Sequence, residues 1–178
     1  QRVAVFRAPG RFGIETKPVP SPAMGEAIVR VTRASVCATD LHIVNGEFPV
    51  RPGLTLGHEA VGVVHELGDD IFGYEPGQRV LFGSTTPCGQ CDNCLNGHAA
   101  HCQGHLGGWR LGNTIDGAQA EFVRIPFAQA NLVPIPETLT DEQVLLLGGV
   151  ASGGFAAVEN GRVGLGDEVA IFGQGPIG

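Results

Sequence analysis

The sequence predicts a mostly β fold over residues 1–147, followed by the beginning of an α/β unit over residues 148–178. Three observations support this prediction. Short β-branched runs separated by turn residues fill the first part, a helix-initiation signal follows them, and the chain ends in a glycine pattern behind an apolar run. The first part is therefore expected to form a β-barrel or a β-sandwich, and the second part is expected to open another domain.

Five β-branched runs predict the strands of the first part. Several of them alternate apolar and polar residues, as a strand with one buried face does. Turn signals such as SPAMG at 21–25 and EPGQ at 75–78 separate the runs. The runs are RVAVFR (2–7), EAIVRVTRA (26–34), AVGVVHEL (60–67), QRVLF (78–82) and AEFVRIP (120–126).

Helices are predicted where the first part ends and the second part begins. Thr140 offers an N-cap, and Gln143 three residues later completes a capping box before an apolar run that glycines end. The stretch at 153–164 predicts another short helix that ends at Gly161, and EVAIF at 168–172 predicts a buried strand.

Composition limits the classes of function. A chain of 178 residues with 43% hydrophobic content can bury a core. Its net charge of -7 argues against nucleic acid and anionic membranes as partners, because both require clustered Lys and Arg. The N-terminal stretch lacks the apolar core of a signal peptide, and no run of about 18 apolar residues is present. Small-molecule or protein partners and a cytoplasmic location, where thiols stay reduced, are expected.

Four of the five cysteines follow the pattern C-x2-C-x2-C-x7-C. One loop with this spacing can hold Zn²⁺ through four thiolates at about 2.3 Å, which leaves no position open for substrate. A reduced core or a pair of disulfides fits less well, because the intervening residues are polar and rich in glycine. The sequence therefore predicts a structural zinc lobe over about 84–108 with the ligands Cys88, Cys91, Cys94 and Cys102. A nearby histidine could replace one thiolate, but with four cysteines in register His98, His101 and His105 are expected at the surface.

A second group of polar residues lies upstream, in SVCATDLH at 35–42 and LGHEAVG at 56–62. One thiolate and one imidazole from two different loops can begin an open zinc site, where the metal polarises a substrate oxygen. A single Cys is more often a small buried apolar residue, and a single His is more often structural. Spacing alone therefore leaves this site as the weaker interpretation of its residues, which are Cys37, Thr39, Asp40, His42, His58 and Glu59.

The chain ends in a G-x-G-x-x-G pattern formed by Gly173, Gly175 and Gly178. Where such glycines directly follow a strand, they permit a tight turn and bring a helix N-terminus close to a dinucleotide pyrophosphate. The pattern alone is weak in a chain with 28 glycines, and the apolar run in front of it supports the dinucleotide interpretation. The rest of such a domain would lie beyond Gly178, so the chain is expected to be part of a longer protein.

Taken together, these segments resemble the N-terminal half of the zinc-dependent alcohol dehydrogenases of the medium-chain dehydrogenase/reductase family. The resemblance covers nearly the whole chain, in the family's order. The stretch at 107–126 is further similar to the branch that acts on secondary alcohols and ketones. The matching segments are CATDLH (37–42), GHEAVGVV (57–64), PGQRV (76–80), the four-cysteine lobe and GDEVAIFGQGPIG (166–178).

The resemblance implies a fold and a set of partners. The first domain would be a GroES-like β-barrel that carries the catalytic site, and the second a Rossmann domain that binds NAD or NADP. The substrate would be a small alcohol or ketone, and the parent protein would be a homo-dimer or a homo-tetramer. This chain alone, without most of the cofactor domain, would be inactive.

The resemblance also implies roles for the upstream residues. Cys37 and His58 would ligate a catalytic zinc, with Glu59 as a further ligand or as a carboxylate beside it. Thr39 would take the proton of the alcohol, His42 would pass that proton towards solvent, and Asp40 would orient a metal ligand. Trp109 matches an aromatic residue of the substrate pocket, although the chain's single Trp fits a core position equally well.

One position departs from the family's pattern. The family places another zinc ligand, Cys or Asp, shortly before a Thr-Gly-aromatic turn, and here that stretch is GGVASGGFAA. The alignment of Gly154 and Phe155 with the turn puts Gly149 at the ligand position, and a shift by one residue puts Gly148 there. Glycine has no side chain to bind metal, so two functions stay open: an alcohol oxidoreductase, or a zinc-bearing GroES-like module for binding or assembly whose redox site has decayed.

Overall fold

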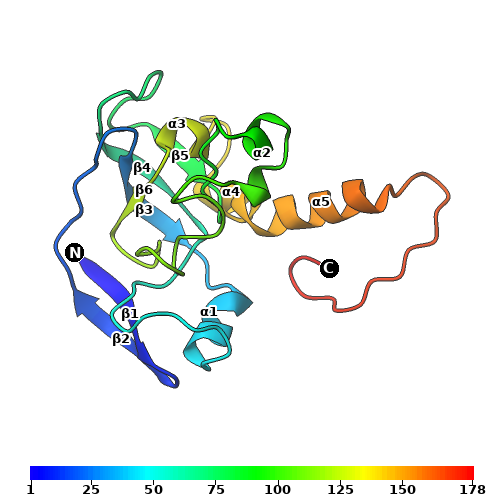
Figure 1. Ribbon diagram of the computed structural model, residues 1–178, viewed down its shortest axis with the longest axis horizontal. Coiled ribbons are helices and arrows are strands. Elements are labelled where there is room, and N and C mark those ends of the chain that lie inside the picture. The colour runs from blue at the N-terminus through cyan, green and yellow to red at the C-terminus, as the bar shows by residue number, and fades with distance from the viewer.

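The computed structural model describes residues 1–178, and residues 1–148 form a β-rich body (Figure 1). Strands β1 (Arg2–Ala8) and β2 (Arg11–Thr16) form an antiparallel hairpin. The other five strands form one antiparallel sheet in the order β6-β3-β4-β5-β7. Their bounds are Ala27–Ala34 for β3, Ala60–Leu67 for β4, Arg79–Phe82 for β5, Phe122–Ile125 for β6 and Leu132–Pro134 for β7.

The apolar core lies mainly on the five-stranded sheet, and the hairpin contributes Phe6 to a second, smaller cluster. Isolated bridges from Val3 to Ala120 and from Val5 to Thr55 tie β1 to the rest of the body. Inward-facing side chains of the sheet make up most of the main core, as alternation along a half-buried strand requires. Its fully or nearly fully buried members include Val29, Val64, Val80, Phe82, Leu111 and Ile125.

The five strands predicted from β-branched runs are all present, with shifts of one or two residues at their ends. Strands β2 and β7 were not predicted. The first of these, RFGIET, is exposed along most of its length and contains glycine, and the second is only three residues long. Short or exposed strands of this kind owe their formation to a partner strand and carry little signal of their own.

Two of the helices position the candidate site. Helix α1 (Ala38–Val44) follows β3, and its Ile43 packs against Phe6 and Leu56 in a second small core. Helix α4 (Asp141–Val144) begins at Thr140 with the predicted capping box: Thr140 N–H donates to Gln143 Oε1 over 2.8 Å, and Gln143 N–H donates back to Thr140 Oγ1 over 3.3 Å. A 3₁₀ turn, η2 (Leu145–Gly148), continues α4.

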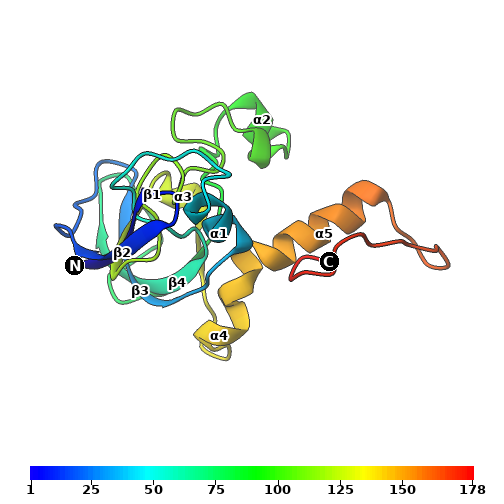
Figure 2. The ribbon, with the colours of Figure 1, turned by 90° about the horizontal axis from the view of Figure 1, so that it is seen from below.

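Two parts of the chain project from the body, as Figure 2 shows. One is the cysteine-rich loop, which contains α2 (Asp92–Leu95) and the 3₁₀ turn η1 (Ala99–His101). The other is helix α5 (Val150–Gly161), which ends at the predicted glycine. The short helix α3 (Ala128–Asn131) lies on the body between β6 and β7.

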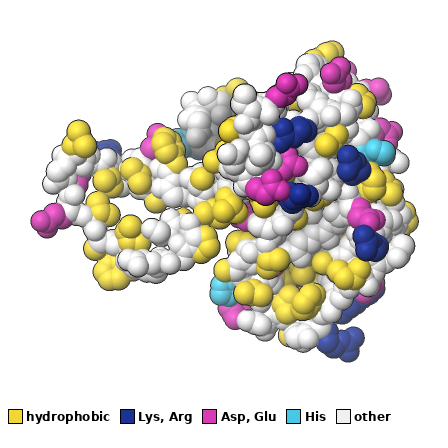
Figure 3. Space-filling view, turned by 180° about the vertical axis from the view of Figure 1, so that it is seen from behind, with side chains coloured by type: hydrophobic (Ala, Val, Ile, Leu, Met, Phe, Trp, Pro, Cys, Tyr) yellow, Lys and Arg dark blue, Asp and Glu magenta, His cyan; other side chains and the backbone are white.

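The strand predicted over 168–172 is not present, so that prediction is wrong. Residues 162–178 form an exposed coil that follows α5 and turns back towards it (Figure 1). Val169 and Phe172 are 57% and 96% exposed. A buried parallel strand needs neighbouring strands for its backbone hydrogen bonds and helices for its faces. The described residues supply neither, and apolar side chains crowd the surface of this arm (Figure 3).

No single helix is long and apolar enough to cross a membrane. The bent pair formed by residues 141–148 and 150–161, with 48° between its halves, meets the test on length and composition alone.

The position of the core predicts that two phenylalanines contribute very differently to the free energy of unfolding. Phe82 is 1% exposed in the main core, whereas Phe72 is 73% exposed. Phe82→Ala should lower the free energy of unfolding by about 3–5 kcal/mol, because it leaves a cavity that the sheet cannot close. Phe72→Ala should change it by less than about 0.5 kcal/mol. Urea unfolding measures both; equal effects of the two substitutions would contradict the placement of this core.

Candidate functional site

Two groups of metal-ligating side chains are brought together by the fold, one in the cysteine-rich lobe and one in the cleft beside α1. In each group the candidate ligand atoms lie within 4.8 Å of one another. The first group is Cys88, Cys91, Cys94 and Cys102, and the second is Cys37, His58 and Glu59.

The four lobe cysteines have the geometry of a closed thiolate site. All five cysteines of the chain are free thiols. The Cys88 and Cys94 sulfurs are 4.0 Å apart, and the Cys91 and Cys102 sulfurs are 3.9 Å apart. Sulfur atoms at about 2.3 Å from a tetrahedral zinc would be separated by about 3.8 Å. The donor set and its spacing therefore fit a structural zinc ion.

The backbone of the lobe is shaped around these sulfurs. Cys88 N–H and Gly104 N–H donate to Cys102 Sγ over 3.2 and 3.3 Å. Gly107 approaches the same sulfur so closely that a Cβ atom there would lie 2.3 Å from it. Only glycine fits such an approach, so the loop can wrap closely around Cys102.

The thiols of the lobe differ in acidity. Hydrogen bonds from the backbone N–H groups of Gln103 and Cys94 lower the pKa of Cys91 to about 6. Burial raises the pKa of Cys94 to about 11. Since zinc binds thiolates, binding must displace the Cys94 proton near neutral pH, and the affinity should fall as the solution becomes more acidic.

Side chains of the body hold the base of the lobe. Asn131, which is 6% exposed on α3, donates from its amide to Pro87 O over 3.0 Å and to Pro126 O over 2.9 Å. The His105 ring lies edge-on to Phe127 at 5.7 Å. The base of the lobe is therefore anchored to α3. The three histidines of the lobe are exposed and lie outside the cysteine cluster, as the sequence predicted.

The second group lies where α1 begins. Cys37 is the N-cap residue of α1, and His58 and Glu59 immediately precede β4. His58 and Glu59 are each 5% exposed. Buried ionisable groups need partners, so a thiol, an imidazole and a carboxylate in contact are a fitting donor set for an open metal site.

Asp40 joins the two segments that carry these ligands. Its carboxylate, 3% exposed, accepts hydrogen bonds from Cys37 N–H over 3.0 Å and from Gly57 N–H over 3.2 Å. Gln119 donates its amide to the same carboxylate over 3.0 Å. Burial raises the pKa of Asp40, and the hydrogen bond from Cys37 and the charge of nearby His58 act against that rise.

His58 has an unsatisfied nitrogen. Its Nδ1 atom is buried and has no hydrogen-bond partner, and Asp40 Oδ1 lies 3.8 Å away. A small tightening of this contact would give the carboxylate–imidazole pair that orients metal-ligating histidines. The structure thus places Asp40 beside His58, one of the candidate ligands, and the expectation that Asp40 orients a metal ligand stays a prediction.

Of the two candidate glycines, Gly149 faces the cleft and Gly148 does not. A Cβ atom at Gly149 would lie 2.4 Å from Glu59 Oε1, whereas a Cβ atom at Gly148 would meet the Phe82 carbonyl oxygen of β5 at 2.5 Å. Of the two glycines that the sequence left open, only Gly149 therefore lies beside the candidate ligands. The Glu59 carboxylate occupies the space that a side chain at residue 149 would need.

The second group of candidate ligands lines a cleft of about 250 Å³. Trp109 forms part of its wall and lies edge-on to the His58 ring at 5.8 Å. The same indole packs against the Phe6, Ile43 and Leu56 core, so Trp109 belongs to the core as well as to the cleft wall, and its contact with substrate stays a prediction. The other lining residues are Cys37, Thr39, Glu59, Ser84, Gly149 and Ile177.

Thr39 and His42 lie on the first two turns of α1. Thr39 Oγ1 is 3.6 Å from Cys37 Sγ, within the cleft. His42 is half-exposed, and its Nδ1 atom is 2.5 Å from Glu47 Oε2. Sequence reasoning missed Glu47, and also Phe48, whose ring lies between His42 at 6.0 Å and Trp109 at 5.9 Å. Neither residue belongs to a motif, and only the turn after α1 brings them here.

The three glycines of the predicted dinucleotide fingerprint do not form a phosphate loop in the described chain. Gly173 adopts a positive φ of 89°, and Gly178 approaches its carbonyl oxygen so closely that a Cβ there would lie 2.2 Å away. The segment contains only bends, and the strand expected before it is missing. Ile177 instead reaches the mouth of the cleft.

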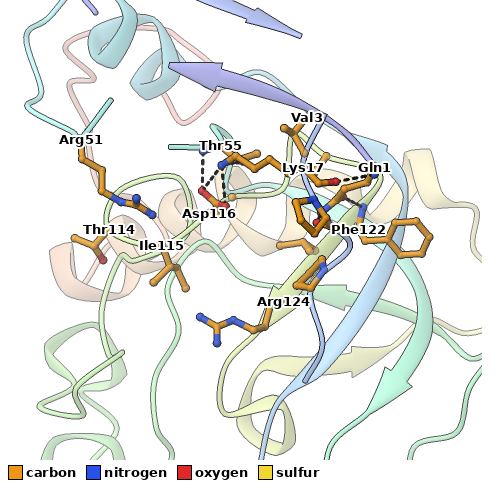
Figure 4. A pocket seen from close by; sticks show the side chains of 15 residues that line it. Gln1, Val3, Lys17, Arg51, Thr55, Thr114, Ile115, Asp116, Phe122 and Arg124 are labelled. Atoms are coloured by element: carbon orange, nitrogen blue, oxygen red, sulfur yellow. Dashed lines mark hydrogen bonds and ion pairs between the residues drawn. The ribbon is translucent and has the colours of Figure 1, made fainter. Parts of the chain in front are cut away.

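Another pocket, of about 270 Å³, lies between β1, β6 and the loop at residues 114–117 (Figure 4). Lys17 Nζ lies within it and donates to Gly53 O, Thr55 Oγ1 and both oxygens of Asp116 over 2.7–2.9 Å. With all its donors used, this lysine holds loops together and has none left for a ligand. The residues that line this pocket include no thiol or imidazole, unlike those of the cleft at Cys37.

Comparison with known proteins agrees with this geometry. The alcohol dehydrogenase GroES-like domain family matches residues 23–137. An alcohol dehydrogenase of Cupriavidus necator is 46% identical over 191 aligned residues, which cover 99% of this chain and 52% of that protein. The chain therefore belongs to the zinc-type alcohol dehydrogenases of the medium-chain dehydrogenase/reductase family, whose GroES-like domain it carries.

Solved structures show the same fold. Alcohol dehydrogenase TADH from Thermus sp. ATN1 superposes with a TM-score of 0.91 at 34% identity, covering 99% of this chain and 52% of that one. Zinc dependent alcohol dehydrogenase 2 from Streptococcus pneumonia, in its apo form, gives a TM-score of 0.91 at 36% identity, covering 99% and 50%. The chain spans about half the length of the curated relatives it matches.

The lobe geometry predicts the effect of removing one thiolate. Cys94→Ser should release the lobe metal and expose residues 84–108 to hydrogen exchange, while the body keeps its protection, because four thiolates supply the folding energy of such a lobe. A strong chelator should do the same to the unmodified protein. Cys37→Ser is the control and should leave the lobe protected; an intact lobe in the metal-free Cys94→Ser variant would contradict the assignment.

The Asp40 contacts predict a loss of stability. Asp40→Ala leaves two backbone N–H groups and the Gln119 amide without their acceptor, and should lower the free energy of unfolding by about 2–4 kcal/mol. Asp69→Ala removes an exposed carboxylate and should change it by less than about 0.5 kcal/mol. Urea unfolding measures the free energy of unfolding of both variants. A loss below about 1 kcal/mol for Asp40→Ala would contradict the role of this carboxylate.

Proposed function

We propose that the protein oxidises an alcohol, in particular a secondary alcohol, to the aldehyde or ketone, and catalyses the reverse reaction, with zinc and NAD or NADP. The observation that carries this proposal is the meeting of Cys37, His58 and Glu59 in one cleft that also holds the Thr39 hydroxyl. The family supports it, since relatives are named alcohol dehydrogenases.

In this proposal Cys37, His58 and Glu59 hold a catalytic metal ion. Zinc bound there would polarise the alcohol oxygen and lower the pKa of the alcohol, and a nicotinamide nucleotide would accept the hydride. The cleft, with only three side chains in the donor set, leaves room for substrate. The four lobe cysteines hold a second, structural zinc ion.

The chain's own residues then move the proton and orient the substrate. Thr39, inside the cleft, accepts the alcohol proton on its hydroxyl oxygen and gives up its own hydroxyl proton in the direction of His42. His42, half-exposed on the next turn of α1, passes that proton to solvent, and Glu47 holds its ring through Nδ1. Trp109 and Phe48 present apolar ring edges to the carbon substituents of the substrate.

The remaining parts of the proposal concern the whole protein. Residues 1–147 would be the catalytic domain, and residues 148–178 would begin a Rossmann domain in which Gly173, Gly175 and Gly178 approach the pyrophosphate. The exposed apolar side chains of α5 and of residues 162–178, such as Phe155 and Phe172, support this because a folded domain would cover them. The parent would be a cytoplasmic homo-dimer or homo-tetramer, and the described chain alone would not turn over alcohol.

A second function is supported by one observation. Gly149 supplies no side chain where the family pattern places a metal ligand. A protein that has lost its catalytic metal but keeps the lobe zinc would act as a GroES-like module for binding or assembly. Metal content separates the two functions, since the enzyme needs about two zinc ions per chain and the module needs about one.

Thr39 provides the direct test of the catalytic proposal. In the full-length protein, assayed with secondary and primary alcohols and with both nucleotides, Thr39→Val should lower kcat at least about 100-fold, because the alcohol proton loses its acceptor. Thr138→Val, at an exposed position outside the cleft, should leave kcat unchanged. Undiminished turnover in Thr39→Val would refute this role, and a wild-type protein with one zinc ion and no turnover would favour the module.

A further inference from the structure

The Glu59 carboxylate is confined from two sides, by Ser35 and by Gly149. Ser35 Oγ donates a hydrogen bond to Glu59 Oε2, and Ser35 N–H donates to the Glu59 carbonyl oxygen over 3.1 Å. On the other side, Gly149 lies against the second carboxylate oxygen, Oε1. The carboxylate therefore has one oxygen engaged and one oxygen free.

The pairing of β3 with β4 fixes the Ser35 contact. Ala34, the last residue of β3, pairs with Ala60, the first residue of β4. Ser35 and Glu59 follow and precede this pair, so the ladder continues by one backbone hydrogen bond between them. The serine hydroxyl is thus held at a fixed place beside the glutamate and does not depend on a flexible loop.

The Gly149 contact leaves no room for a side chain. A Cβ atom at residue 149 would lie 2.4 Å from Glu59 Oε1, 3.0 Å from Cδ and 3.2 Å from Cγ. The φ angle of Gly149 is -137°, outside the left-handed region that favours glycine, so the constraint is the contact itself. Any larger residue must push the Glu59 carboxylate away from its present place.

We propose that Ser35 and Gly149 are positioning residues that make the Glu59 carboxylate the third protein ligand of the metal at Cys37 and His58. Ser35 holds Oε2 and leaves Oε1 for the metal, and Gly149 keeps open the space that Oε1 needs. The carboxylate then takes the coordination position that a side chain at residue 149 would otherwise supply. This inference rests on the proposed function only in requiring a metal ion at Cys37.

An exchange of carboxylates between the two positions tests the inference. Glu59→Ala should weaken metal binding at Cys37 about 100-fold or more, since a ligand is lost. The double variant Glu59→Ala/Gly149→Asp supplies a carboxylate from the other side and should recover at least about 10-fold of that loss. Glu59→Ala/Gly149→Ala, which has no carboxylate in either place, is the matched control and should stay weak.

Single substitutions test the two positioning residues separately. Ser35→Ala should weaken the Cys37 site about 10-fold, and Ser35→Thr, which keeps the hydroxyl, should restore it. Gly149→Ala should weaken the site to a similar degree by displacing Oε1. Gly161→Ala, on the same helix, meets only a Val163 methyl group at 3.4 Å and should leave the affinity unchanged.

The readout is Co²⁺ titration of the full-length protein, followed by the thiolate-to-cobalt absorption of Cys37, with the lobe kept loaded with zinc. An unchanged urea unfolding midpoint of the metal-free protein shows that the body of each variant is folded. The inference is overturned if Glu59→Ala/Gly149→Asp binds no better than its alanine control, or if Ser35→Ala and Gly149→Ala bind as tightly as wild type. Alcohol turnover is measured in parallel. If the metal affinities follow the expected pattern but the protein does not turn over alcohol, the proposed activity is refuted and the ligand assignment is still supported.

Discussion

The hydrogen bonds of the buried Asp40 carboxylate hold the cleft together. They join the start of α1, which carries Cys37, to the segment before β4, which carries His58 and Glu59, and to Gln119 before β6. Three stretches that are distant in the sequence thereby meet at one anion. Burial makes this charge costly, and the N–H donors around it offset that cost. Without this anion, the ligand-bearing segments would lose their common partner.

The two metal groups illustrate two ways of building a site. The lobe is local: its four cysteines lie on one loop, and glycines let the backbone wrap around the sulfurs. The cleft is assembled from distant segments, namely the start of α1, the approach to β4 and the start of α5. A local site requires only its own loop, whereas the cleft requires the β3–β4 register, the Asp40 contacts and the close approach of Gly149. The cleft is therefore the site that depends on the whole body being folded.

What the sequence could predict follows from this difference. The cysteine spacing, the capping box at Thr140 and the five β-branched strands are local signals, and the structure contains each of the corresponding elements. Strands β2 and β7 owe their existence to partner strands, and residues 168–172 remain coil because they have none. Ser35, Glu47 and Phe48 belong to no motif; the strand register brings Ser35 to the site, and the turn after α1 brings the other two. The choice between Gly148 and Gly149 likewise depended on which one faces Glu59.

The central claim is that the cleft holds a metal ion through Cys37, His58 and Glu59. Anomalous scattering at the zinc edge, from crystals of the full-length protein grown with added zinc, tests it most directly. The claim predicts two peaks per chain, one within the four cysteine sulfurs and one between Cys37 Sγ and His58, with Glu59 Oε1 at about 2.0–2.2 Å from the second. A full peak in the lobe with no peak at Cys37 would contradict it.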